Sequence, residues 1–226
     1  MHRLLRTRVL IPCGVALLVL SGCLGSTPPT QFYLVPPLSA PDTPPPASAG
    51  RRDLTLGVGP VTIPPYLDRP QIVTRTSRAK LALADFDQWA GPLSDTIPRV
   101  LAENLSLLVP TERVILHPWP RTIDPDYQVT VDVQQFDRGP GNQVVLAARW
   151  SLLDRDGKEL VLRTSRINQA ASGADYEATV TAMGQALDTL AQDIATTLRG
   201  MAQPAPRANE GTIKPTRSAY KGVGAR

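Results

Sequence analysis

The sequence predicts an α+β fold, a single domain with a mostly antiparallel sheet and two amphipathic helices packed on it. Two turn signals separate three strand-like runs between residues 127 and 170, which is typical of an antiparallel meander. Two other stretches repeat apolar residues every three or four positions, as a helix with one buried face does. We expect the domain to span about residues 51–200, long enough for one hydrophobic core without disulfides.

The N-terminus has the layout of a bacterial lipoprotein signal. Three arginines precede an apolar run over about residues 9–20, which is shorter than the ~20 residues of a transmembrane helix. Leu20-Ser21-Gly22-Cys23 then resembles a lipobox, so we expect residues 1–22 to be a signal peptide and Cys23 to be acylated. A plain signal peptide with an incidental cysteine is the alternative. Leu24 stands where aspartate would indicate inner-membrane retention, so by resemblance to enteric sorting we expect the outer membrane.

Residues 23–50 are expected to form a proline-rich tether, because proline removes backbone donors and favours an extended chain. A short apolar and aromatic run near residues 31–35 predicts an edge strand within it, ended by Pro36 and Pro37. The alternative is a segment of the tether that docks on a partner.

The first half of the domain contains strand patterns followed by one helix. The expected strands cover residues 54–63 and 71–76, with 80–83 as a third candidate, and residues 84–90 follow with Phe86 and Trp89 as aromatic anchors.

The helix is expected at about residues 95–108. If Ser94 or Asp95 is its N-cap, Pro98 falls in the first turn, where the amide needs no acceptor. Pro110 should end it.

The second half contains a short strand at 113–116 and then the meander, whose strands are expected at 127–136, 143–153 and 159–170. Gly139–Asn142 and Asp154–Gly157 provide the turns between them.

The longest helix should follow, with its apolar stripe running from Tyr176 to Leu198, Asp175 as N-cap and Gly200 at its end. Residues 201–226 are basic and nearly free of apolar side chains, so we expect a disordered tail.

Charge and residue counts exclude several function classes. The net charge of +4 comes from the two ends of the chain, because residues 23–206 carry 16 basic and 19 acidic residues. A nucleic-acid-binding protein would carry its basic residues on the folded body. The mature chain keeps a single histidine, His117, and histidine-dependent catalysis would need partners for it. Metal sites built from several His or Cys ligands are excluded by count. We therefore expect no enzyme activity, cofactor or metal.

One long stretch carries a family resemblance. Leu56–Arg75, which contains Pro-Tyr-Leu-Asp-Arg-Pro, resembles the opening of the PqiC-like family of ABC-type transport auxiliary lipoproteins. Phe86–Ala90, Leu101–Leu105 and Asp126–Val129 match further along, and the resemblance covers roughly residues 23–200. It implies a non-catalytic outer-membrane lipoprotein that faces the periplasm and assembles as a homo-oligomeric ring. The implied partners are a tube-forming MCE-domain protein and an inner-membrane permease, with lipid as cargo and envelope integrity as the purpose.

The signature between the first two strands is a candidate contact surface. Rigid aromatic and arginine side chains are enriched at interface hot spots, so Tyr66, Leu67, Arg69 and Pro70 are predicted to bind a neighbouring subunit or the MCE partner. The alternative is a buried turn held by a bond of Asp68 to Arg69 or to the backbone.

Two other functions stay open at this stage. A lipoprotein that scaffolds or activates a cell-wall enzyme would use the tether equally well. A lipid carrier with its own pocket is less favoured, because a chain with 5% aromatic residues and one core leaves little room for a cavity.

Overall fold

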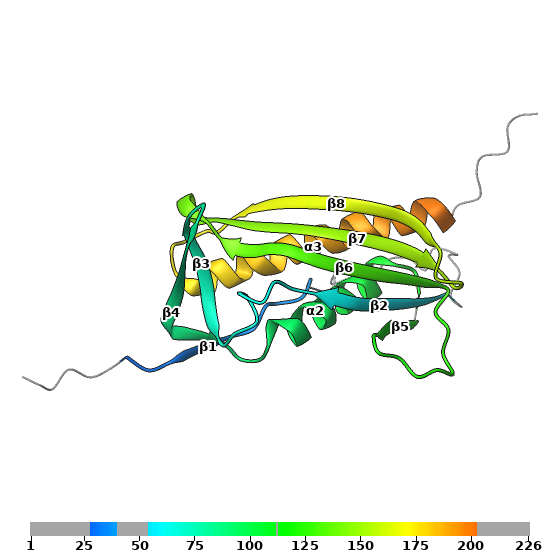
Figure 1. The fold of residues 1–226 in the computed structure, drawn as a ribbon, viewed down its shortest axis with the longest axis horizontal. Coiled ribbons are helices and arrows are strands. Elements are labelled where there is room, and N and C mark those ends of the chain that lie inside the picture. Colours follow the sequence, from blue (N-terminus) through cyan, green and yellow to red (C-terminus); the bar gives the residue numbers. More distant parts are fainter. Residues whose placement is uncertain (1–27, 40–53, 112, 203–226) are drawn as a thin grey trace, which may run out of the picture.

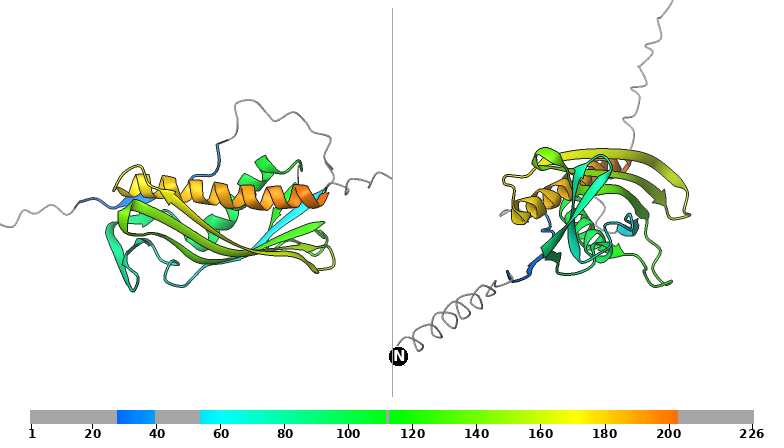
Figure 2. Two further views of the ribbon diagram at one scale, coloured as in Figure 1. Left: turned by 90° about the horizontal axis from the view of Figure 1, so that it is seen from above. Right: turned by 60° about the vertical axis from the view of Figure 1, so that its left-hand side comes forward.

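A twisted eight-stranded sheet carries both long helices on one face (Figures 1 and 2). The computed structural model describes residues 28–39, 54–111 and 113–202. The predicted signal peptide, Cys23, the remainder of the tether and the tail from residue 203 lie outside the described residues.

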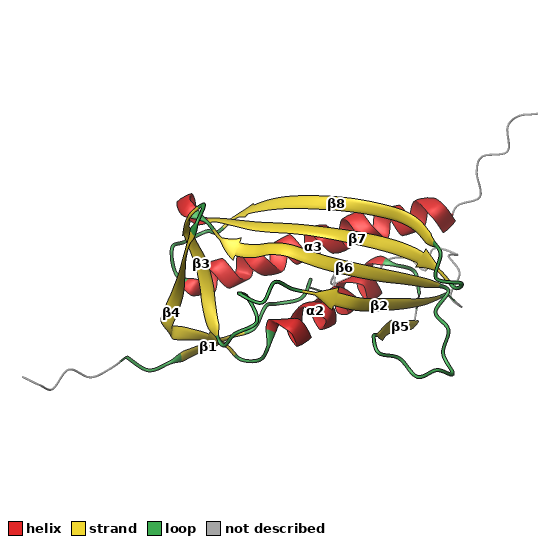
Figure 3. Cartoon of the chain, viewed as in Figure 1, coloured by secondary structure: helices red, strands yellow, loops and turns green. Residues whose placement is uncertain are grey.

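Figure 3 separates the helices from the strands. The elements in chain order are β1 (Gln31–Tyr33), β2 (Thr55–Thr62), β3 (Gln71–Ser77), β4 (Lys80–Trp89), α2 (Leu93–Leu108), β5 (Arg113–Leu116), β6 (Tyr127–Arg138), the 3₁₀ turn η1 (Pro140–Asn142), β7 (Gln143–Asp154), β8 (Glu159–Ala170) and α3 (Tyr176–Ala202). No helix among these described residues is both long enough and apolar enough to cross a bilayer.

The sheet is mixed, and its long ladders are antiparallel. Strands β6, β7 and β8 form the predicted meander, and β3 pairs with β4 as a second hairpin. Strand β2 lies parallel between β5 and β6, and β1 lies parallel to β4 at an edge. Neighbouring strands joined by short turns must run antiparallel, whereas strands that return through a helix or a long loop can pair in parallel. The predicted α+β class with a mostly antiparallel sheet is confirmed.

The two meander turns use the chemistry that the sequence predicts. The Asp154 side chain accepts hydrogen bonds from the backbone amides of Asp156 and Lys158 at 3.0 and 2.9 Å, and Gly157 has φ of 78°. In η1, Gly141 and Asn142 have φ of 74° and 58°. Glycine and asparagine tolerate this left-handed region best, so both turns are encoded locally.

Several predicted boundaries are wrong, since β1 ends at Tyr33 and not near residue 35, and β6 continues to Arg138. Helix α2 begins at Leu93, with Pro92 at the N-cap, so neither Ser94 nor Asp95 caps it and Pro98 lies beyond the first turn. Leu93, the first residue of the predicted apolar stripe, is buried and already belongs to the helix.

Helix α3 is capped as predicted, since Asp175 accepts a bond from the Ala178 amide at 2.7 Å. It does not end at Gly200, because it continues to Ala202 and Met201 packs against the core. Strand β4 also runs on to Trp89, because Gln88 has a strand partner on either side.

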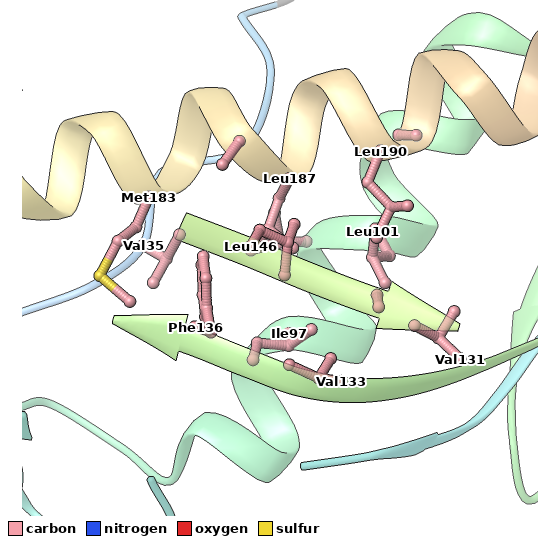
Figure 4. Packing of buried hydrophobic residues seen from close by; sticks show 14 of the residues in the cluster. Val35, Ile97, Leu101, Val131, Val133, Phe136, Leu146, Met183, Leu187 and Leu190 are labelled. Atoms are coloured by element: carbon pink, nitrogen blue, oxygen red, sulfur yellow. The ribbon is translucent and has the colours of Figure 1, made fainter. Parts of the chain in front are cut away.

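The core lies between the sheet and the two helices (Figure 4). Phe136 from β6 and Leu146 and Trp150 from β7 are at most 1% exposed. The predicted stripe of α3 supplies the other wall with Val180, Met183, Leu187, Leu190, Ile194 and Leu198. Trp89 is buried as the expected anchor, whereas Trp119 is only partly buried and packs over Gly57 and His117.

Candidate functional site

The predicted contact residues lie in the connection between β2 and β3. We call residues 64–70 the signature loop. Its backbone folds on itself, with hydrogen bonds from the amides of Leu67 to Pro64 (2.9 Å), Asp68 to Pro65 (3.3 Å) and Arg69 to Leu67 (2.9 Å). Three of its seven residues are proline, which restricts φ. The loop is therefore a rigid turn.

Two of the predicted residues fasten the loop from beneath. Leu67 is 2% exposed and belongs to the hydrophobic core. Tyr66 is partly buried, and its hydroxyl donates a hydrogen bond of 2.9 Å to Asp137 Oδ2 on β6. Neither side chain is free to reach far from the surface, so their first effect is to position the loop.

Asp137 is the centre of a buried polar group that we call the Asp137 cluster: Tyr66, Arg75, Gln135 and Asp137. The Asp137 side chain is fully buried, and Arg75 approaches it with Nη2 at 2.8 Å and Nε at 3.2 Å. Gln135 Nε2 donates at 2.9 Å to Oδ1, so each carboxylate oxygen accepts two hydrogen bonds. A buried charge is tolerated when it is paired and its lone pairs are satisfied in this way.

The electrostatics of the Asp137 cluster keep its donors protonated. The hydrogen bond to Asp137 raises the pKa of Arg75 above its ordinary value. Burial, together with the neighbouring carboxylate, raises the pKa of Tyr66 to about 12. The Arg75 guanidinium also lies 5.9 Å from the centre of the Tyr66 ring, within cation–π range. The Asp137 cluster is therefore a fully hydrogen-bonded structural contact that joins the signature loop to β3 and β6.

The outer side of the signature loop is available to a partner. Pro65, Asp68 and Pro70 are exposed, and Arg69 is partly exposed. Asp68 accepts a hydrogen bond of 3.1 Å from the Ser94 hydroxyl, which ties the loop to the start of α2. Within residues 28–39, 54–111 and 113–202, no ion pair joins Asp68 to Arg69. Arg69 Nε is buried and has no hydrogen-bond partner in the described part of the chain.

The signature loop shares one end of the sheet with β1. The Trp89 amide donates to the Pro70 carbonyl at 2.7 Å, and the next amide, that of Ala90, donates to the Tyr33 carbonyl at 2.9 Å. The end of β4 therefore joins the loop to the N-terminal strand. The predicted surface and the segment that leads to Cys23 lie side by side.

His117, the one histidine weighed as a catalytic candidate, lies outside the signature loop. His117 is exposed, its amide donates to the Val58 carbonyl at 2.8 Å, and its ring meets Trp119 edge-on at 5.3 Å between centroids. The described ranges contain no group of three or more His, Cys, Asp or Glu residues placed to hold a metal ion. Cys23 lies outside the described residues.

The Asp137 cluster was not predicted from the sequence. Asp137 directly follows the run expected as a strand, and Tyr66 and Arg75 precede it by 71 and 62 residues. The only local signal is that Asp137 directly follows Phe136, at the end of a strand with alternating apolar residues. An acidic residue in such a place can be buried, and a buried charge needs a partner.

Comparison with known protein families shows the class of protein to which the chain belongs. Residues 36–195 match the family of ABC-type transport auxiliary lipoprotein components, which is more than half of the chain. The chain therefore belongs to this family.

Its curated relatives are transport lipoproteins. The chain is 29% identical over 184 residues to the intermembrane transport lipoprotein PqiC of Escherichia coli strain K12, and the alignment covers 80% of this chain and 94% of that protein. The PqiC of Shigella flexneri matches to the same extent. The predicted resemblance to the PqiC-like family is therefore confirmed.

Two crystal structures share the fold. That of an uncharacterized protein has a TM-score of 0.63 at 22% identity and covers 76% of this chain and 99% of its own. The crystal structure of a Xanthomonas campestris protein has a TM-score of 0.61 at 18% identity, and the match covers 77% of this chain and 100% of that protein.

Proposed function

We propose that this protein is a non-catalytic, outer-membrane lipoprotein subunit of an MCE-type intermembrane lipid transport system. Acylated Cys23 anchors it, and the folded domain faces the periplasm. There it docks the tube of an MCE-domain protein to the outer membrane, with the inner-membrane permease as the distal partner. The observation that carries this proposal is the match to PqiC, a curated intermembrane transport lipoprotein, across 94% of that protein's length.

The signature loop is the proposed contact surface. Its proline-restricted backbone and its attachment through Leu67 and the Asp137 cluster fix its shape before binding, so little conformational entropy is lost on association. Arg69 and Pro70 offer the outward face, while Tyr66 and Leu67 hold it from beneath. The partner is the MCE protein or the neighbouring subunit of a homo-oligomeric ring.

Co-purification from the native membrane tests the function. The tagged lipoprotein is crosslinked mildly, solubilised and purified, and its partners are identified by mass spectrometry. An MCE-domain protein and its permease in the eluate would support the proposal. A cell-wall synthase or hydrolase without any MCE protein would overturn it and favour the scaffold function, since one fold can serve several functions.

Variants separate a contact role of the loop from a structural one. Arg69→Ala and Pro70→Ser should lower recovery of the partner while leaving the unfolding midpoint nearly unchanged. Arg166→Ala, an exposed arginine on β8, is the matched control and should change neither. If the loop variants lose stability but still recover the partner in full, the loop is a structural turn and not an interface.

A further inference from the structure

The N-terminal segment is part of the folded domain before it leads toward Cys23. Strand β1 pairs with the end of β4, and the Tyr33 hydroxyl donates to Asp87 at 2.9 Å. Val35 is 3% exposed. The point where the chain leaves the domain toward the anchor is therefore fixed at β1.

Further contacts hold the segment against both helices. The Leu38 amide donates to Asn104 Oδ1 at 2.7 Å, and Asn104 Nδ2 donates to Asp188 Oδ1 on α3 at 2.8 Å. Pro36 lies so close to Gly184 that a Cβ there would approach the Pro36 carbonyl to 2.8 Å. Residues 31–38 therefore form a clamp across β4, α2 and α3.

Two large apolar side chains in this clamped segment have no place in the core. Phe32 is 65% exposed and Leu34 is 64% exposed, the highest values among the large hydrophobic residues described. Tyr33 and Val35 alternate with them and point inward, so Phe32 and Leu34 share the outer side of the extended segment. We call these two side chains the β1 patch.

The distance along the chain from the anchor limits what the β1 patch can meet. About nine residues separate Cys23 from Phe32, and even fully extended they span only about 30 Å. With Cys23 acylated, the bilayer surface is thus within constant reach of the patch.

We propose that the β1 patch contacts the bilayer, with Phe32 and Leu34 immersed among the lipid headgroups and the upper acyl chains. One acyl-anchored cysteine and two immersed apolar side chains together hold the β1 end against the membrane. The domain then points its other end, where α3 terminates, away from the bilayer (Figure 1). The proposal rests on the proposed function only for the acyl anchor, which keeps the β1 patch close to the bilayer and adds to its own weak affinity, and it requires no transport partner.

A single fluorescent label measures the immersion. The chain has only two cysteines, of which Cys13 leaves with the signal peptide and Cys23 is acylated, so an added cysteine is labelled uniquely. Acylated Phe32→Cys and Leu34→Cys proteins carry an environment-sensitive dye in vesicles of phosphatidylethanolamine and phosphatidylglycerol. Some of the vesicle lipids carry a quencher on the acyl chain. Flotation of each sample with the vesicles is measured first and reports separately on the anchor.

The matched control is Leu162→Cys on β8, an apolar side chain of 54% exposure near the far end of the molecule, where its neighbour Arg163 contacts Thr197 of α3. Acyl-chain quenching at positions 32 and 34 several-fold above that at position 162 is the expected result. Equal, weak quenching at all three positions in floated protein would overturn the proposal and leave the β1 patch to a protein partner.

A second measurement avoids the dye. The mature Cys23→Ser protein should partition weakly onto the same vesicles, and Phe32→Ser with Leu34→Ser should lower that partition by about tenfold or more, because each immersed side chain contributes to transfer. The single substitution Leu162→Ser should leave it unchanged. If the Cys23→Ser protein partitions onto the vesicles equally well with and without the substitutions Phe32→Ser and Leu34→Ser, the proposal is contradicted.

Discussion

The hydrogen bond between Tyr66 and Asp137 gives the sharpest test of how the signature loop is held. Tyr66→Phe removes one donor and leaves the shape of the ring. Asp137 Oδ2 then keeps only its 2.8 Å bond to Arg75. Hydrogen bonds to charged groups contribute about 1.5–3 kcal/mol. Because Tyr66 is only partly buried, we expect the lower half of that range, about 1.5–2 kcal/mol.

Urea unfolding of the mature domain, followed by tryptophan fluorescence, measures this change. The midpoint should fall while the slope stays constant, and the thermal midpoint should drop by about 3–8 °C. Tyr127→Phe is the matched control, because Tyr127 is also partly buried and its hydroxyl has no hydrogen bond within the described residues. It should change stability by less than about 0.5 kcal/mol. If Tyr66→Phe lowers the free energy of unfolding by no more than this control does, the hydrogen bond to Asp137 does not hold the signature loop and the reasoning is refuted.

The pH dependence of the same variant has a defined sign. The folded-state pKa of Tyr66 is about 12, above the ordinary tyrosine value of 10.0. A raised acid pKa contributes stability that is fully present below the unfolded pKa and is lost as the pH rises through the folded one. The difference between the wild type and Tyr66→Phe should therefore stay constant up to about pH 9.5 and shrink between about pH 10 and 12.

Two further predictions test the clamp and the helix beneath it. Gly184→Ala should cost about 1–2 kcal/mol and expose residues 31–38 to protease, because the new Cβ meets Pro36, whereas Gly200→Ala in the same helix has open space and should stabilise by about 0.5–1 kcal/mol. If Gly184→Ala and Gly200→Ala change stability and protease sensitivity equally, Pro36 does not pack against Gly184 as described. Burial raises the pKa of Asp188, so Asp188→Asn should match or exceed wild-type stability at pH 7, with the difference narrowing toward pH 4. A loss above about 1 kcal/mol at pH 7 would show that the bond to Asn104 outweighs burial.

The antiparallel meander and the helix stripes could be predicted because their causes are local. Asp154 and Gly157 encode one turn with their own side chain and backbone freedom. The spacing from Val180 to Leu198 places the buried face of α3. Such features depend on residues a few positions apart, so the sequence alone carries them.

The parallel pairs and the site depend on residues far apart in the chain. Strand β2 pairs with β6 across about 70 residues, and its short pattern gives no sign of which neighbour it will take. The same holds for Asp137: Arg75 reaches it because β3 pairs with β6 at Thr74 and Arg138, and Tyr66 reaches it from the loop between β2 and β3. The signature loop was found by resemblance, but its division into a fastened underside and an exposed face required the three-dimensional structure.

Site-specific photo-crosslinking at the exposed position 65 of the signature loop tests the central claim most directly. The crosslinking side chain is placed at position 65 because Pro65 is exposed in the signature loop and is not one of the proposed contact residues, and any residue there keeps the backbone carbonyl that accepts the hydrogen bond from the Asp68 amide. Irradiation of living cells should join the lipoprotein to an MCE-domain protein or to its own neighbour in a ring, with no such product from position 166 on β8. A product with a cell-wall enzyme alone, or equal products from both positions, would contradict a transport subunit that docks through its signature loop.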